Sequence, residues 1–206
     1  HQLSETDQIA DKGQYRHFMQ KEMFEQATVL ADTFAGRIGA DYILEAVFGH
    51  QAEGLFAQTK NIHIIACGTS FHSGLVAKYW LEDMAGVPCQ VEVASEYRYR
   101  KVAVPDGTLF VTISQSGETA DTLAALHKAK ESGYLGFVAI CNVANSSLVR
   151  ESDISLMTMA GPEIGVASTK AFTTQLVALQ LLTLSLGRHT GLPAGMEAEW
   201  VKNLHQ

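Results

Sequence analysis

The chain has 206 residues, of which 47% are hydrophobic and 18% are charged. This composition is typical of a folded globular protein with a core of its own. The formal net charge of −7 argues against a nucleic-acid-binding surface, because such a surface needs a basic face.

Two further features bear on the compartment. No apolar run reaches the roughly 18 residues of a membrane span, so we expect no membrane partner. Cys67, Cys89 and Cys141 show no Cys-x-x-Cys spacing, which is typical of reduced thiols in a cytoplasmic protein. Cys67 follows a predicted strand, but no base near it in the sequence would make it a nucleophile.

Both ends of the sequence suggest a piece of a longer protein. Residues 1–13 are polar, lack a signal peptide and are expected to be a disordered start, a tag remnant or a linker. Residues 191–206 contain the beginning of a further helix, which we expect to lead into a part of the protein that is absent.

Residues 14–60 are predicted to form a helical N-terminal extension. A first helix over 14–35 is indicated by apolar residues at helical spacing, with polar residues expected mostly on the opposite face. The apolar set is Phe18, Met19, Met23, Ala27, Leu30, Ala31 and Phe34, and the polar set is Lys21, Glu22, Glu25 and Gln26. Asp41 is expected to cap a second helix that restarts after Gly49 and continues to about Gln58.

From Asn61 the pattern changes to alternating strands and helices, which indicates a parallel α/β sheet. The five expected strands are 62–66, 89–93, 109–113, 136–141 and 154–157. Residues 61–190 are therefore predicted to be one flavodoxin-like, doubly wound domain with strand order 2-1-3-4-5. Its last element is expected to be a long helix from Ser168 to about His189.

The loop after the third expected strand holds the main candidate site. Ser114, Gln115, Ser116 and Thr119 surround Gly117 where the strand ends and a helix begins. Glycine lets the backbone approach a ligand closely, and the free N–H groups at a helix N-terminus attract an anion. Ordinary helix capping would need only one of these hydroxyl groups. We therefore predict a phosphate-binding loop.

A second loop, residues 67–70, follows the first expected strand and adds Thr69 and Ser70. In a sheet of order 2-1-3-4-5, strands one and three are neighbours whose helices leave on opposite faces, so ligands bind in the crevice between them. A Ser168-Thr169 pair at the start of the long helix could close over this crevice.

The same loops lack the motifs of cofactor sites. Neither G-x-G-x-x-G nor G-x-x-x-x-G-K-S/T occurs at a strand-to-helix junction, and the eight histidines show no H-E-x-x-H spacing. We therefore expect no cofactor and no metal. Neutral hydroxyl and amide donors suit a phosphate monoester instead.

These residues carry a resemblance to a known family. Ser114-Gln-Ser-Gly-Glu-Thr119, placed after a strand, resembles the signature of the SIS (sugar isomerase) phosphosugar-binding domain. Longer segments resemble the family of isomerizing glutamine–fructose-6-phosphate aminotransferases, also called glucosamine-6-phosphate synthases. These segments are residues 15–26, Ala66-Cys-Gly-Thr-Ser70, Ala94-Ser-Glu-Tyr-Arg-Tyr-Arg100 and Glu163-Ile-Gly-Val-Ala-Ser-Thr-Lys-Ala-Phe-Thr-Thr-Gln175.

The resemblance implies an enzyme that makes glucosamine-6-phosphate from fructose-6-phosphate and glutamine. Members join a glutaminase domain to two SIS halves and form homodimers, and this chain resembles the linker helix and the first SIS half. The substrate-binding residues that it implies are Thr69, Ser70, Ser114, Gln115, Ser116 and Thr119 at the phosphate, and Val166 and Ser168 at the sugar.

The family's catalytic glutamate, lysine and histidine lie in the second SIS half, and nothing after Gly187 matches them. We therefore assign no catalytic residue to this fragment and expect it to bind the sugar phosphate without making the product. Two alternatives stay open. A stand-alone SIS aldose–ketose phosphate isomerase would need its own glutamate and histidine, and a non-catalytic phosphosugar sensor should carry a DNA-binding helix-turn-helix.

Three charged residues near the loops have simpler interpretations than catalysis. Glu118 is expected to complement the helix dipole rather than to act as a base. Glu163 could orient the sugar loop, and Lys170 is expected to be solvated rather than to neutralise the phosphate.

Overall fold

The structure is a computed structural model that describes residues 11–205. Its centre is a five-stranded parallel sheet of order β2-β1-β3-β4-β5, which confirms the predicted topology. The strands are β1 (Asn61–Ala66), β2 (Cys89–Val93), β3 (Thr108–Ser114), β4 (Gly136–Cys141) and β5 (Ile154–Met157). A helix connects each strand to the next, so the strands are covered on both sides, and this is why most of them are continuous apolar runs.

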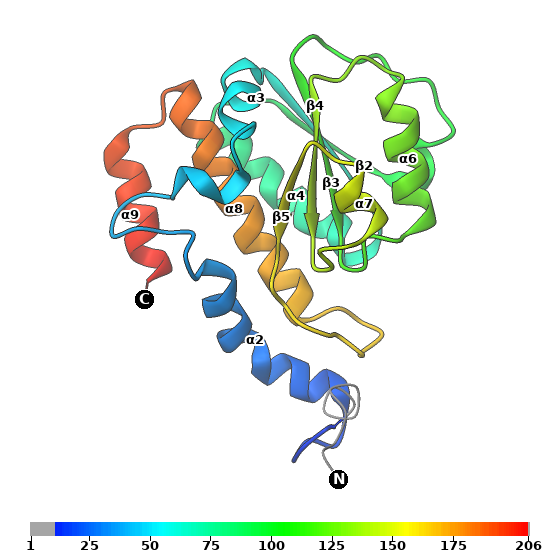
Figure 1. The fold of residues 1–206 in the computed structure, drawn as a ribbon, viewed down its shortest axis with the longest axis vertical. Helices are drawn as coiled ribbons and strands as arrows, with labels where there is room; N and C mark the ends of the chain where they lie inside the picture. The colour runs from blue at the N-terminus through cyan, green and yellow to red at the C-terminus, as the bar shows by residue number, and fades with distance from the viewer. Residues whose placement is uncertain (1–10, 206) are drawn as a thin grey trace.

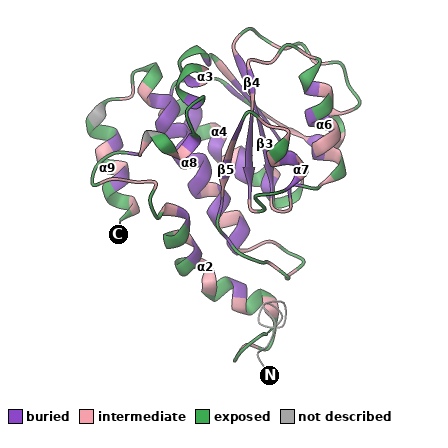
Figure 2. Ribbon diagram, viewed as in Figure 1, coloured by how far each residue is buried: buried purple, intermediate pink, exposed green. Residues whose placement is uncertain are grey.

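Helices cover both faces of the sheet (Figure 1). One layer contains α3 (Ala52–Gln58), α4 (Gly68–Asp83) and α8 (Lys170–Thr190), and the other contains α5 (Ala94–Tyr97), α6 (Ala120–Lys130) and α7 (Ser147–Arg150). Successive strand residues alternate between the two cores, so that Ile64 packs with α4 and α8 while Ile65 packs with α6. Figure 2 shows burial concentrated in the strands and along α8.

The segment before the sheet differs from the prediction at Asp41. No helix begins there: an isolated antiparallel bridge joins Ile38 to Ile43, and a short 3-10 helix, η1 (Glu45–Phe48), follows. The predicted restart after Gly49 is confirmed by α3. Only residues 42–48 lie between Asp41 and Gly49, and so short a segment does not compensate for the cost of starting a helix.

The first helix, α2 (Phe18–Phe34), buries only part of the predicted face: Leu30 and Phe34 pack against the core. Its buried residues are Glu22, Val29 and Thr33, whereas Met19 and Met23 are exposed. The reason is tertiary: α2 packs on α8 and on the loop that follows β5, whose backbone N–H groups bind the carboxylate of Glu22. Apolar spacing therefore indicated the packed face correctly at the C-terminal end of α2 and wrongly at Met19 and Met23.

The segments on either side of the sheet share its core. Ile43, Phe48 and Val201, the last from α9 (Ala194–Leu204), belong to the same buried cluster as the strands. The predicted domain boundaries at residues 60 and 190 stay a prediction.

The two ends of the chain complete the description. Residues 1–10 of the expected disordered start lie outside the described residues. Within the described part of the chain, no helix is both long enough and apolar enough to cross a membrane.

Candidate functional site

The two predicted loops lie at the same edge of the sheet. β1 and β3 are adjacent, with Ala66 opposite Ile113, so the loops that follow them start from neighbouring positions. The helices that follow pack on opposite faces, which makes this the point where the winding of the sheet reverses. Cys67 of the first loop lies with its Sγ 4.0 Å from Thr122 Oγ1 of α6. The fold therefore brings both candidate loops to the position where doubly wound sheets bind ligands.

The β3–α6 loop turns at Gly117, whose φ of +67° is a conformation that other residues rarely adopt. Ser114 is buried, and its Oγ accepts a 2.9 Å hydrogen bond from Gly117 N. Ser116 Oγ accepts a 3.2 Å hydrogen bond from Glu118 N. Ser114 therefore shapes the loop from inside. The half-exposed residues of the loop are Gln115, Ser116 and Thr119.

Helix capping does not explain the hydroxyl groups of this loop. Thr119 is the N-cap residue of α6, but its side chain makes no capping hydrogen bond. Its hydroxyl lies 3.4 Å from Ser114 Oγ instead. The first N–H groups of α6 are thus not used by their own cap residue, which is the arrangement that suits an anion.

Glu118 has a different partner from the one predicted. Its Oε1 accepts a 2.7 Å hydrogen bond from Ser147 N, at the start of α7. This hydrogen bond lowers the pKa of Glu118, because it stabilises the charged form. Glu118 therefore ties the β3–α6 loop to α7 rather than complementing α6.

The predicted loop over residues 67–70 is shorter in the structure, because α4 begins at Gly68 and Thr69 and Ser70 therefore lie in its first turn. Their two hydroxyl groups have different settings. Thr69 is exposed, whereas Ser70 is buried and its Oγ accepts a 3.0 Å hydrogen bond from Gln175 Nε2 of α8. Gln175 is itself held by Ser73, whose Oγ donates to its Oε1 at 3.2 Å. The sequence does not predict this contact between Gln175 and Ser70. The only local signal is that Gln175 is a polar residue in a helix that is otherwise mostly apolar.

The predicted sugar-end residues lie in the loop between β5 and α8. Val166 is fully exposed at its tip. Ser168 Oγ donates a 2.9 Å hydrogen bond to Glu163 Oε2, and Glu163 Oε1 accepts from the backbone N–H groups of Thr169 at 2.9 Å and Ala171 at 3.1 Å. Glu163, not Ser168, therefore holds the start of α8.

Lys170 is not solvated as predicted. It is 4% exposed, and its Nζ lies 2.7 Å from Glu25 Oε2 of α2. The sequence pattern missed this pair because the two residues are 145 positions apart. Lys170 is therefore engaged in the contact between α2 and α8.

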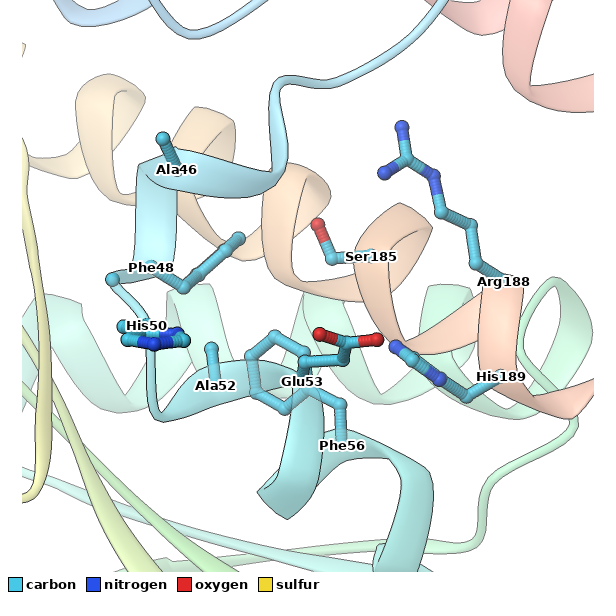
Figure 3. Close-up of a pocket in the computed structure, with 10 residues that line it drawn as sticks. Ala46, Phe48, His50, Ala52, Glu53, Phe56, Ser185, Arg188 and His189 are labelled. Carbon is cyan, nitrogen blue, oxygen red and sulfur yellow. The ribbon is translucent and has the colours of Figure 1, made fainter.

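A separate cavity of about 430 Å³ lies between the η1–α3 segment and the end of α8. Phe48, Phe56, Glu53 and His189 project into it (Figure 3). It contains none of the predicted site residues, and α8, which has 21 residues and is therefore about 30 Å long, separates it from Ser168. The cavity is thus distinct from the candidate phosphate site.

The described residues contain neither a cluster of metal ligands nor a disulfide bond. Within residues 11–205, no group of three His, Cys, Asp or Glu side chains is placed to hold a metal ion. The three cysteines are free thiols.

The chain is similar to known proteins over its whole length. Glutamine–fructose-6-phosphate aminotransferase (isomerizing) from Pseudomonas putida is 65% identical over all 206 residues of this chain, which cover 34% of that protein. The same enzyme from Legionella pneumophila (strain Lens) is 62% identical over 90% of this chain and 31% of its own length. The chain therefore spans about a third of the length of these relatives.

A solved structure shows the same architecture. The C-terminal domain of glucosamine-fructose-6-phosphate aminotransferase from Francisella tularensis superposes with a TM-score of 0.92 at 52% identity, over 95% of this chain and 55% of that one. The profile of the SIS domain family matches residues 55–185. The expected resemblance is confirmed, and the chain belongs to the SIS domain family.

Proposed function

We propose that the chain is the sugar-phosphate-binding half of an isomerizing glutamine–fructose-6-phosphate aminotransferase. The observation that carries this proposal is the hydroxyl-rich turn at Gly117, which lies at the start of α6 beside the β1–α4 loop. The similarity to the aminotransferases extends over the entire chain and supports fructose-6-phosphate as the ligand.

In this proposal the phosphate binds over the N-terminus of α6. The hydroxyl groups of Ser116 and Thr119 and the side-chain amide of Gln115 donate to it, together with the free N–H groups of the helix. Thr69 and Ser70 reach it from the first turn of α4, and Gln175 keeps the Ser70 hydroxyl oriented. Each hydrogen bond to a charged phosphate oxygen contributes about 1.5–3 kcal/mol.

The sugar then extends toward the loop between β5 and α8, where Val166 and Ser168 contact it. Holding the sugar in one orientation favours its reaction with ammonia, because translational and rotational freedom is already lost. The catalytic side chains, the glutaminase domain and the second SIS half belong, in this proposal, to the remainder of the protein. We further propose that the whole protein is a cytoplasmic homodimer, and the free thiols of this chain support a reducing compartment.

Calorimetric titration with fructose-6-phosphate tests the phosphate site. We expect the chain to bind, and Ser116→Ala to lose about 1–3 kcal/mol of binding free energy through one lost hydrogen bond to a charged group. Thr28→Ala, an exposed hydroxyl deletion on α2, is the matched control and should bind normally. Equal affinities of the Ser116→Ala variant and the original chain would place the phosphate elsewhere.

Incubation of the chain with glutamine and fructose-6-phosphate tests whether this chain binds the sugar phosphate without catalysing the reaction. We expect no glucosamine-6-phosphate, because the assigned residues bind and orient but do not catalyse. Formation of that product would contradict the assignment of catalysis to other parts of the protein. Isomerisation of the sugar phosphate by this chain alone would favour a stand-alone isomerase.

A further inference from the structure

Helix α2 contacts the loop between β5 and α8 in three places. Near one end of the helix, Thr33 Oγ1 donates a hydrogen bond to the carbonyl oxygen of Thr158, the first residue after β5. At the other end of the loop, Glu25 pairs with Lys170, the first residue of α8. The third contact is made by Glu22, which binds Ile164 and Gly165 between these two ends of the loop. Figure 1 shows α2 running past the start of α8 and the loop before it.

Glu22 binds the middle of this loop through its backbone. Its side chain is buried, with 3% of the residue exposed, although a carboxylate is costly to remove from water unless it is hydrogen-bonded. Glu22 Oε1 accepts hydrogen bonds from Ile164 N at 2.5 Å and from Gly165 N at 3.0 Å. These N–H groups are available to it only in the observed loop conformation, so the carboxylate favours that conformation.

The close approach depends on the glycine. A Cβ built on Gly165 would lie 2.4 Å from Glu22 Oε2, so any other residue would displace the carboxylate. Within the loop, Glu163 binds Ser168, Thr169 and, in the first turn of α8, Ala171. The loop is therefore held from two sides, and Val166 is left exposed at its tip.

We propose that Glu22 is a positioning residue that holds the loop in the conformation in which Val166 and Ser168 contact the sugar. The proposal rests on the proposed function, since it assumes that these two residues meet the sugar of a sugar phosphate. It assigns to α2, a helix outside the βα loops, an indirect part in sugar binding through the loop that it holds. The phosphate site at Gly117 is formed by other elements and should not depend on Glu22.

The test compares two probes, fructose-6-phosphate and inorganic phosphate, by calorimetry on the chain and on Glu22→Gln. Glutamine keeps one acceptor oxygen for Ile164 N and Gly165 N, but its NH₂ group cannot accept the second hydrogen bond from Gly165 N at the position of Oε2, and the remaining hydrogen bonds lose their charge, so the support of the loop is weakened. We expect the dissociation constant for fructose-6-phosphate to rise about tenfold or more, as the loss of a hydrogen bond to a charged group implies. The dissociation constant for inorganic phosphate should stay within about twofold, because its ligands are untouched.

A second readout reports on the loop without any ligand. Amide hydrogen exchange of residues 163–168 should accelerate in Glu22→Gln and stay unchanged in Glu131→Gln, which removes an exposed carboxylate elsewhere. Gly165→Ala should reproduce the loss of sugar-phosphate affinity. In a Glu22→Ala background, the same glycine replacement should cost little more, because the displaced group is already absent.

Three results would overturn the positioning role. The first is that amide exchange of the loop is the same in Glu22→Gln as in the original chain, and the second is that the two proteins bind fructose-6-phosphate with equal affinity. The third is that Glu22→Gln loses affinity equally for both probes, which would indicate general disruption. Failure of the original chain to bind either probe would instead refute the proposed function. The binding of the original chain is therefore measured before any variant is made.

Discussion

Gly117 and Ser146 are in direct contact, and no side chain fits between them. A Cβ built on Gly117 would lie 2.1 Å from Ser146 Oγ, far inside van der Waals distance. The turn of the β3–α6 loop is therefore packed against the segment that leads into α7. The shape of the candidate phosphate site depends on this contact as well as on the positive φ of the glycine.

Gly117→Ala should therefore disrupt the loop. We expect the free energy of unfolding to fall by about 2–4 kcal/mol, the sum of a left-handed backbone penalty and an overpacking penalty, and phosphate binding to be lost. Urea denaturation and phosphate titration measure the two effects. Gly86→Ala is the matched control, because Gly86 has a φ of +62° but open space around its Cβ, and it should cost only about 1 kcal/mol. Equal losses in the two variants would show that the contact with Ser146 is unimportant.

The ion pair of buried Lys170 and partly exposed Glu25 should respond unequally to the loss of either partner. Glu25→Gln leaves the ammonium of Lys170, whose side chain is 5% exposed, without its counter-charge. Lys170→Met leaves a carboxylate that is 32% exposed and can regain water. We expect Glu25→Gln to lower the free energy of unfolding by about 2 kcal/mol and Lys170→Met by less than about 1 kcal/mol. Urea denaturation measures both losses. A larger loss in Lys170→Met than in Glu25→Gln would show that an unpaired Lys170 is not the main cost.

Thiol reactivity should separate Cys67 from Cys89. Burial, together with the charge of Glu82, raises the pKa of the Cys89 thiol to about 12, so almost none of it is the reactive thiolate at pH 8. Cys67 is only partly buried, at the end of β1. We expect iodoacetamide to modify Cys67 first and Cys89 only after unfolding, as followed by peptide mass spectrometry.

Because Cys67 adjoins the candidate loops, bound fructose-6-phosphate should slow its modification. Reaction of Cys89 at the rate of Cys67 in the folded chain would contradict the first expectation.

His63 should make stability depend on pH. Its ring lies between Glu92, 3.4 Å from Nε2, and the hydroxyl of Tyr134, 2.8 Å from Nδ1. Burial lowers the pKa of His63, and the attraction of Glu92 offsets this only in part. The unfolded chain therefore takes up the proton first. Neutral His63 therefore contributes its full share to the free energy of unfolding above about pH 6.5, the pKa of histidine in the unfolded chain. This contribution is lost as the pH falls from there toward the lower pKa that His63 has in the folded chain.

The measurement is the free energy of unfolding at pH 7.5 and pH 5.5. The original chain should be less stable at the lower pH, and His63→Phe should show a smaller difference between the two values. The comparison with the variant removes the contributions of the other histidines. Identical pH dependence in both proteins would show that His63 does not titrate in this way.

The sheet and its loops were predictable because their signals are local. β4 and β5 have the predicted bounds, since each is a short apolar run between turn residues. Gly117 and the hydroxyl groups around it lie within six consecutive residues, and the alternation of strands and helices placed this loop beside Thr69 and Ser70. The binding of a phosphate there stays a prediction.

The roles of buried polar residues were decided by the tertiary structure alone. The sequence predicts Glu22 on the face opposite the apolar residues of the first helix and Lys170 in solvent, yet both are buried. Their partners, Gly165 and Glu25, are more than 140 positions away in the sequence. A polar side chain is buried only where a distant segment supplies a matching donor or acceptor, and no local pattern of polarity contains that information. The sequence by itself therefore determined the strands and the candidate phosphate loop, while tertiary packing decided what holds the sugar loop in place.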